Sequence, residues 1–265
     1  MATIRRAIIT TKTDQQLWQA ASEGNLSGVI EALNKGADVN ARGPLDNTAL
    51  NQAAEQGHIE IVKRLLEVKA DIHNVGGADK TPIMNAAFAG NVEIVQLLLE
   101  KGALVTNDLL SSVQLKVNIL EENAELGMVN PKAVEAWKGF LGFLVTARLE
   151  QDLPEIVKGL STEELEERKT ALARIESAAK RGIDVSAAVP RLCELASDQD
   201  AETRSTVGAV LSTHYVQDRD WDRLRELFET RDQKVKVGAI PMLVSAAQDG
   251  VDVSPLVPTI VNLLS

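Results

Sequence analysis

The segment TALNQAAEQGHIEIVKRLL, residues 48–66, holds the pattern on which the interpretation of this chain is built. It contains two stretches of helical character separated by Gly57, a residue that adopts the left-handed conformation at no steric cost. In the second stretch, apolar residues recur on one helix face, namely Ile59, Val62, Leu65 and Leu66. Lys63 and Arg64 fall between them, on the side left for water. The segment therefore predicts two short helices joined by a tight turn.

The same pattern recurs with a period of 33 residues. The recurring positions are three glycines and three alanine pairs: Gly24, Gly57 and Gly90, with Ala20-Ala21, Ala53-Ala54 and Ala86-Ala87. Paired alanines let neighbouring helices approach closely, and one such unit cannot bury its apolar face alone. The period therefore predicts an α-solenoid of three stacked helical hairpins over residues 14–107, after an N-terminal tail of residues 1–13.

Two short motifs repeat within this region and indicate a family. TALNQAA (48–54) and TPIMNAA (81–87) approximate the pattern T-P-L-H-x-A-A, and EIVKRLL (60–66) and EIVQLLL (93–99) match E-I-V-x-x-L-L. Both patterns are typical of ankyrin repeats, which this region resembles. Two features depart from the family. Trp18, Asn51 and Met84 stand where its loop-tying histidine is usual, and Lys69 replaces the glycine that usually ends the second helix.

The resemblance implies a protein partner, bound by the turn tips and by the concave face of the first helices. Carried onto this chain, the tip residues are Arg42, Pro44, Leu45, Asn47, Val75 and Lys80. The concave residues are Gln52, Glu55, Gln56, Asn85 and Phe88, with Gln19, Ser22 and Glu23 in the first unit. Leu45, Val75 and Phe88 have no evident duty in the core, which favours a contact patch. Isolated surface hydrophobes are the alternative.

Residues 161–265 follow a different repeat. The segment 177–190 matches 245–258 at an offset of 68 residues, which divides into two units. Helix starts are predicted at Asp200, at Asp232 and at the capping-box pattern Ser161-Thr-Glu-Glu164. This half resembles HEAT-type repeats, more loosely than the first half resembles its family. The resemblance implies a buried ladder of turn aspartates and basic residues, with Asp200 paired to Arg204 and Asp232 to Lys236.

Residues 108–160 are expected to form two connecting helices. Gly127 ends the first, and Pro131 begins the second at a position where proline is favoured. Aromatic residues concentrate here, including Trp137 and Phe140, and are interpreted as a hydrophobic plug rather than a ligand pocket. At the other end, a last helix over Pro255 to Leu264 has no following partner. It therefore allows self-association through an open apolar face.

The sequence shows no signature of an enzyme. His58 is interpreted as structural, His73 as solvated, and Cys193 as a small buried hydrophobe rather than a nucleophile. The glycines are interpreted as helix punctuation, because no phosphate-binding glycine pattern occurs. No catalytic, cofactor-binding or metal-binding residue is therefore assigned. The alternative is a HEAT-like cofactor-handling or enzyme-associated protein, which would need a pocket near Trp221, His214 and Tyr215.

The bulk composition narrows the classes of partner. The formal net charge is −10, which disfavours nucleic acid and anionic membranes because both bind through clustered Lys and Arg. It allows a basic protein partner, although acidity also serves solubility. No apolar run approaches the length of a membrane span, and the single cysteine excludes an intrachain disulfide. We expect a non-catalytic protein-binding scaffold or adaptor in the cytoplasm.

Overall fold

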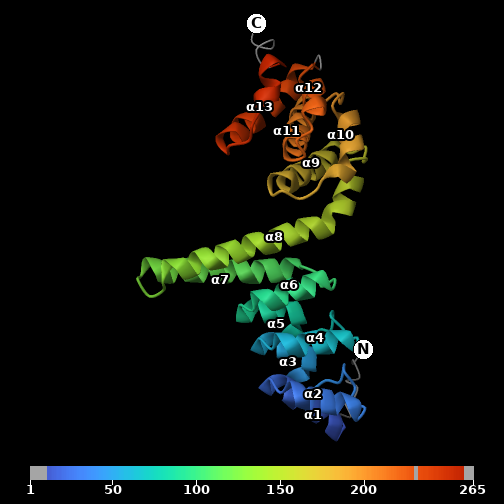
Figure 1. The fold of residues 1–265 in the computed structure, drawn as a ribbon, viewed down its shortest axis with the longest axis vertical. Helices are drawn as coiled ribbons and strands as arrows, with labels where there is room; N and C mark the ends of the chain where they lie inside the picture. Colours follow the sequence, from blue (N-terminus) through green and yellow to red (C-terminus); the bar gives the residue numbers. More distant parts are fainter. Residues whose placement is uncertain (1–10, 230–231, 260–265) are drawn as a thin grey trace. The chain divides into compact units, whose positions relative to one another are not determined.

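The computed structural model describes residues 11–229 and 232–259, with the side chain of Leu45 excepted. Within them the chain forms α-helices and short 3-10 helices, with one isolated β-bridge between Arg42 and Thr48 (Figure 1). The chain divides into two compact units, Met1–Val145 and Thr146–Ser265, which are called unit 1 and unit 2 below. The expected all-α solenoid of helical hairpins is confirmed.

Unit 1 begins with three helical hairpins of nearly equal size. The first helices of the hairpins, α1, α3 and α5, lie in sequence order along the stack (Figure 1). Their bounds are α1 Lys12–Glu23, α3 Ala49–Gln56 and α5 Pro82–Ala89. The second helices are α2 Leu26–Asn34, α4 Ile59–Glu67 and α6 Val92–Glu100, and the tips carry η1 Pro44–Asp46 and η2 Gly77–Asp79.

The alanine pairs form the centre of this stack. All six alanines are buried, from Ala20 at 6% exposure to Ala87 at 0%. Small side chains let the first helices approach one another closely, and this close packing is how the 33-residue period becomes a continuous core. In α4 the buried residues are Ile61, Val62 and Leu65. The buried face of α4 is therefore slightly rotated from the predicted one, because Ile59 and Leu66 are only half-buried.

The backbone at the helix ends follows the expectation for glycine, with one exception. Gly24, Gly57 and Gly90 all have positive φ, between 75° and 81°. The second helices of the first and third hairpins are followed by Gly36 and Gly102, also at positive φ. In the middle hairpin Lys69 occupies this position with φ 64°, a conformation that costs a residue with a Cβ about 1–2 kcal/mol.

The missing histidines have different consequences in the second and third hairpins. Asn51 Oδ1 accepts a hydrogen bond from Thr48 Oγ1 at 2.6 Å, and Asn51 Nδ2 donates to the carbonyl of Lys80 at 3.0 Å. Asparagine therefore ties the next loop down. Met84 offers no such polar group, and the buried Thr81 Oγ1 has no hydrogen-bond partner within the described part of the chain.

A pair of long helices follows the third hairpin. Helix α7 spans Asn107–Glu125 and α8 spans Pro131–Gly159, with Pro131 as the first helical residue as expected. Trp137 and Phe140 meet edge to face, with ring centroids 5.8 Å apart, and Phe140 is buried. The Trp137 ring also lies 3.7 Å from where a Cβ on Gly90 would stand. In unit 1, Trp137 therefore packs against the turn between the two helices of the third hairpin.

In its described residues, unit 2 contains the last part of α8, from residue 146, and then three long helices with shorter helices between them. The long helices are α9 Leu165–Lys180, α11 Ala201–Gln217 and α13 Gln233–Gln248. The others are α10 Val189–Leu195, α12 Trp221–Glu229, η3 Ser186–Ala188 and η4 Ser254–Leu256. Asp200 and Asp232 cap α11 and α13 as predicted, because each carboxylate accepts from a backbone amide of the first turn.

Of two expectations for the ends of unit 2, one is wrong and the other falls largely on residues that the structure does not describe. The predicted capping box at Ser161 is wrong: α9 begins four residues later, and its N-cap residue is Glu164. Thr162 supplies the local hydrogen bonds, since its hydroxyl accepts from the Glu164 amide and donates to the Glu167 carboxylate. Of the predicted last helix, residues 257–259 are helical, and residues 260–264 lie outside the described residues.

Two glycines inside helices bring α11 and α13 into direct contact. A Cβ on Gly208 would lie 2.1 Å from the carbonyl oxygen of Val235, and one on Gly238 would lie 1.9 Å from that of Ser205. Neither distance is tolerable for a real side chain, so only glycine permits this helix spacing. The interpretation of the glycines as helix punctuation is therefore wrong at these two positions, where they set the packing of unit 2.

Candidate functional site

The candidate binding surface of unit 1 is formed by the hairpin tips and the first helices behind them. Each tip is closed by a backbone hydrogen bond, from Gly43 N to Asn47 O at 2.8 Å and from Gly76 N to Lys80 O at 2.9 Å. Asn47 then links the two tips, since its Oδ1 accepts from the Gly77 amide at 2.9 Å. The tips are therefore held in register by their own backbone and by a side chain that points along the stack.

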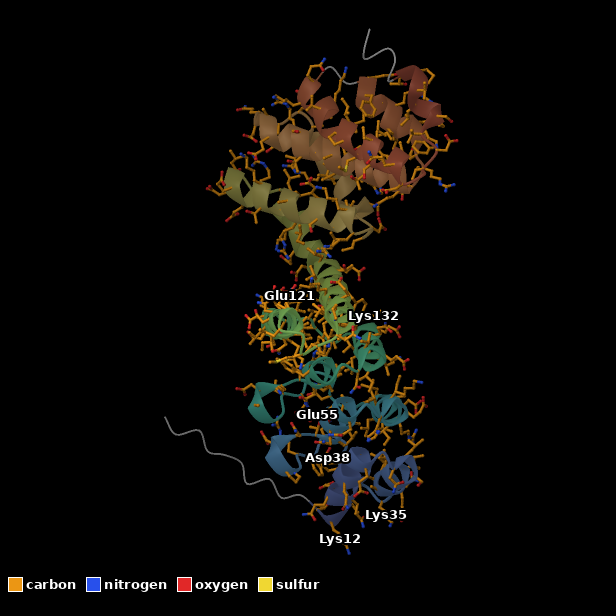
Figure 2. All side chains as sticks on the ribbon, turned by 90° about the vertical axis from the view of Figure 1, so that its left-hand side faces the viewer. Lys12, Lys35, Asp38, Glu55, Glu121 and Lys132 are labelled. Carbon is orange, nitrogen blue, oxygen red and sulfur yellow. The ribbon has the colours of Figure 1, made fainter. Side chains whose placement is uncertain are left out.

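Several predicted contact residues do reach the surface. Pro44, Glu55, Gln56 and Val75 are exposed, Val75 at 43%, while Arg42, Lys80 and Phe88 are half-exposed. Glu55 lies near the C-terminal end of α3 (Figure 2). Arg42 is engaged by Asp46, with Nη1 2.6 Å from Oδ2. The side chain of Leu45, which was also predicted to make contacts, lies outside the described part of the chain.

Three of the predicted contact residues are buried instead. Asn47 and Gln52 are each 9% exposed, and Asn85 is 4% exposed. Asn47 serves the tip-to-tip bond, and Gln52 and Asn85 lie on the side of their helices that faces neighbouring hairpins rather than water. The placement of Gln52 and Asn85 on an open concave face was therefore wrong, because the close spacing allowed by the alanine pairs covers these positions as well. Asn47 does lie at a tip as predicted, but it is buried there.

One aromatic contact connects a tip to an inner helix. The Lys80 ammonium lies 4.5 Å from the centroid of the Phe88 ring, which is within the range of a cation–π interaction. Lys80 comes from the second tip and Phe88 from α5. Phe88, which was predicted as an apolar contact residue, is therefore partly covered by the Lys80 ammonium. Val75, which belongs to the same tip as Lys80, remains exposed.

A hollow of this surface lies between the first hairpin and the first tip. It has a volume of about 670 Å³ and is lined on the α1 side by Asp14, Gln15, Trp18, Gln19, Ser22 and Glu23. The opposite wall is the first tip, residues 41–44. Gln19, Ser22 and Glu23 were predicted as concave positions, but Asp14, Gln15 and Trp18 were not. The sequence held one indication of this part of the hollow, because Trp18 stands where ankyrin repeats usually have histidine.

Trp18 and the tip are fitted to one another. A Cβ on Gly43 would stand 2.3 Å from Trp18 Cδ1, so glycine lets the backbone lie directly against the indole. The indole Nε1 is buried and has no hydrogen-bond partner among the residues that the structure describes. The ring itself is half-exposed and forms part of the wall of the hollow. The wall therefore offers an aromatic surface to whatever enters.

A buried carboxylate also lines this hollow. Asp14 is 7% exposed and accepts hydrogen bonds from the amides of Thr11 and Asp38, both at 2.8 Å. Burial raises the pKa of Asp14, but the hydrogen bonds from Thr11 and Asp38 outweigh it and hold the pKa below its ordinary value. Asp14 is therefore negatively charged at neutral pH.

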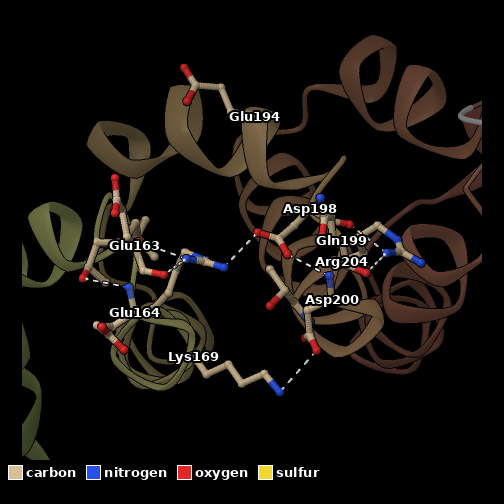
Figure 3. Close-up of polar contacts among 12 residues, drawn as sticks. Glu163, Glu164, Lys169, Glu194, Asp198, Gln199, Asp200 and Arg204 are labelled. Atoms are coloured by element: carbon tan, nitrogen blue, oxygen red, sulfur yellow. Dashed lines mark hydrogen bonds and ion pairs between the residues drawn. The ribbon is translucent and has the colours of Figure 1, made fainter.

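In unit 2 the polar contacts form a ladder between successive hairpins (Figure 3). Arg168 pairs with Asp198 at 3.3 Å, Lys169 with Asp200 at 3.5 Å, and Arg204 with Asp232 at 2.7 Å. The predicted pairing of Asp200 with Arg204 is wrong, because Asp200 caps its own helix while Arg204 reaches forward. Likewise, Asp232 pairs with Arg204, in place of its predicted partner Lys236.

The arginines of this ladder also fix the turns before their helices. Arg204 Nη1 donates to the carbonyls of Asp198 and Gln199, at 2.7 and 3.0 Å. Arg168 Nη1 makes the same kind of contacts to Thr162 and Glu163, at 2.9 and 3.2 Å. The repetition of this arrangement indicates a structural element that holds one hairpin on the next. Because both guanidinium groups are engaged in these contacts, we assign them no role in binding a partner.

Of the three residues named for an alternative pocket in unit 2, His214 and Tyr215 are buried and Trp221 is half-exposed. His214 and Tyr215 are 6% and 5% exposed, and their rings lie 5.5 Å apart. Burial, with Cys193 nearby, raises the pKa of Tyr215 to about 12, so its hydroxyl stays protonated at neutral pH. Cys193 is exposed, which corrects the expectation of a buried thiol, and its Sγ lies 3.9 Å from Tyr215 Oη.

The remaining chemistry of unit 2 is sparse. A hollow of about 570 Å³ lies at the C-terminal ends of α9, α11 and α13, with Lys180, Met242 and Asp249 in its wall. In the part of the chain that the structure describes, no three His, Cys, Asp or Glu side chains gather closely enough to hold a metal ion. Nor does any helix in that part combine the length and apolar character that a membrane crossing requires.

Comparison with known proteins identifies the first region. Residues 17–108 match the family model for ankyrin repeats, in three copies. The expectation of three ankyrin repeats in the N-terminal half is confirmed. No curated protein matches the chain.

Proposed function

We propose, from the three ankyrin repeats that unit 1 carries, that this chain is a non-catalytic scaffold which binds a protein partner across those repeats. Ankyrin repeats generally serve protein–protein interaction and are typically non-catalytic. The partner would lie along the tips and the first helices of the hairpins. The residues that would contact it are Arg42, Pro44, Glu55, Gln56, Val75, Lys80 and Phe88. A cytoplasmic location and HEAT-like repeats in unit 2 belong to the same proposal, the latter supported by the ladder of ion pairs.

One observation carries this proposal: the side chains that hold the stack together are separate from those that it exposes. Asn47 and Asn51 bond along the stack, and the alanine pairs fill its centre. Val75 at 43% exposure and the exposed Glu55 contribute to neither task. A row of exposed side chains on a rigid frame suits an extended protein surface, because little conformational entropy is lost on binding.

Photo-crosslinking tests the proposed surface. A benzophenone amino acid is placed at Gln56, on the inner face, or at Val92, on the second helix of the third hairpin and 39% exposed. Both full-length proteins are irradiated in lysate of the native host, and the adducts are identified by mass spectrometry. We expect one reproducible adduct from Gln56 that is absent from Val92. Equal adducts from both positions, or an adduct from Val92 alone, would refute the surface.

A further inference from the structure

The hollow of the first hairpin differs from the rest of the binding surface in its lining. Trp18 lines it with a half-exposed indole ring, and the tip backbone at Gly43 lies against one side of that ring. Another aromatic residue of the proposed surface, Phe88 in the third hairpin, is already in contact with the Lys80 ammonium at 4.5 Å. The Trp18 ring has no such cation among the described residues. An aromatic face of this kind attracts cations, and tryptophan does so best.

The charges in the wall have the matching sign. Asp14 and Glu23 are carboxylates, and Arg42 is the single basic side chain known to line the hollow. Arg42 is already neutralised by Asp46 at 2.6 Å. Glu23 is exposed, and one of its oxygens accepts from Gln19 Nε2 at 2.8 Å, which orients the carboxylate and leaves its second oxygen available. The net charge of the lining therefore favours a cation over an anion.

We propose that this hollow binds an arginine or lysine side chain of the protein partner, with its aliphatic stem along Trp18 and its charged end between the Trp18 ring and the Glu23 carboxylate. The proposal rests on the proposed function and names the chemistry that one part of the surface recognises. It assigns Trp18 and Glu23 as specificity-determining residues. Asp14 contributes its negative charge from below the surface, since its own hydrogen bonds are satisfied by Thr11 and Asp38.

The test uses a pair of peptides that differ only in charge. The full-length protein is labelled with ¹⁵N, and the indole N–H signals of its three tryptophans are followed. The probes are acetyl-Gly-Ala-Arg-Ala-Gly amide and the same peptide with citrulline, which is nearly isosteric but neutral. We expect the arginine peptide to shift the Trp18 signal in a saturable way. The signals of Trp137 and Trp221 should stay in place, and citrulline should have no effect.

Variants locate the contact. Glu23→Gln should weaken binding of the arginine peptide about fivefold, which corresponds to ~1 kcal/mol. Trp18→Leu should abolish saturable binding, as read from peptide anisotropy. Glu31→Gln is the matched control, because Glu31 is an exposed acid of the same hairpin paired to Lys35, and it should bind as wild type does. If Trp18→Leu fails to fold, Glu23→Gln alone decides the question.

The outcomes separate this proposal from the one before it. Equal shifts with arginine and citrulline, or unchanged affinity in Glu23→Gln, would overturn the cation site. The crosslink from Gln56 would still stand in that case, because it reports the surface and not the chemistry of this hollow. Conversely, a partner that crosslinks only at Val92 would refute the surface assigned under the proposed function while leaving a saturable, charge-dependent shift of Trp18 intact.

Discussion

The contact between α11 and α13 leads to a sharp prediction, because two glycines hold it. In Gly208→Ala the new methyl group would stand 2.1 Å from the Val235 carbonyl oxygen, whereas real contacts of this kind exceed about 3 Å. The two helices must therefore separate by roughly 1 Å. Backbone atoms cannot rotate away as a side chain would, and overpacking of this kind costs about 1–3 kcal/mol.

The separation also loosens the core beside the glycines. Val207, Leu211, Val235 and Ala239 are all at most 1% exposed, and a gap of 0.5–1 Å forfeits a quarter to a half of each dispersion contact. We therefore expect Gly208→Ala to lower the free energy of unfolding of unit 2 by about 3 kcal/mol, at the upper end of the overpacking range. Gly238→Ala should have a similar effect, since its methyl group would lie 1.9 Å from the Ser205 carbonyl oxygen.

Hydrogen exchange with mass spectrometry measures this effect within unit 2. A loss of 3 kcal/mol corresponds to roughly 100-fold faster exchange in peptides from α11 and α13. The control is Gly139→Ala, also within a helix, where nothing lies within 4 Å of the new methyl group. That substitution should stabilise its helix by about 0.5–1 kcal/mol. Exchange in Gly208→Ala within threefold of wild type would refute the argument from helix spacing.

Three further predictions follow from single features. Lys69→Gly should raise the free energy of unfolding of unit 1 by about 1 kcal/mol in urea denaturation, because it relieves the positive φ of 64°, whereas Lys35→Gly, at φ −82°, should lower it. Met84→His should give the Thr81 hydroxyl, which has no hydrogen-bond partner among the described residues, a partner, and should raise the free energy of unfolding by about 1 kcal/mol. In a double-mutant cycle, the gain should disappear when Thr81 is replaced by valine, and additive effects of the two substitutions would contradict this bond. The Thr203 amide lowers the pKa of Asp200, more than burial raises it, so stability from this carboxylate is present above its ordinary pKa of 3.8 and is lost as pH falls through the lowered value. Asp200→Asn should flatten the acid limb of unit 2 in thermal melts between pH 2 and pH 5, and an unchanged limb would count against it.

The repeats of unit 1 were predictable because their signal is periodic. Each alanine pair and each turn glycine is repeated three times, so chance matches are excluded by the spacing itself. The sequence also marked Lys69 as a departure, and the structure shows its cost as a positive φ. Three ankyrin repeats and an all-α solenoid could therefore be read from the chain before any coordinates.

The site was less predictable, because burial along the short first helices depends on how closely neighbouring hairpins approach. Gln52 and Asn85 were expected in the open, yet the close stack covers them. The ladder of unit 2 was assigned within helices because sequence spacing shows only local neighbours. Arg204 instead reaches Asp232 in the next hairpin. The spacing of α11 and α13 was equally hidden, since an isolated glycine in a helix gives no sign of a facing backbone.

The tip-to-tip bond of Asn47 with Gly77 has a consequence for how such a surface can change. Its acceptor and donor both belong to the frame, so exchanging outward residues such as Val75 or Pro44 leaves the loop backbone where it is. The atoms that would contact a partner are then different from the atoms that hold the turn in its conformation. A new target could be acquired by a handful of outward substitutions, with the architecture inherited unchanged.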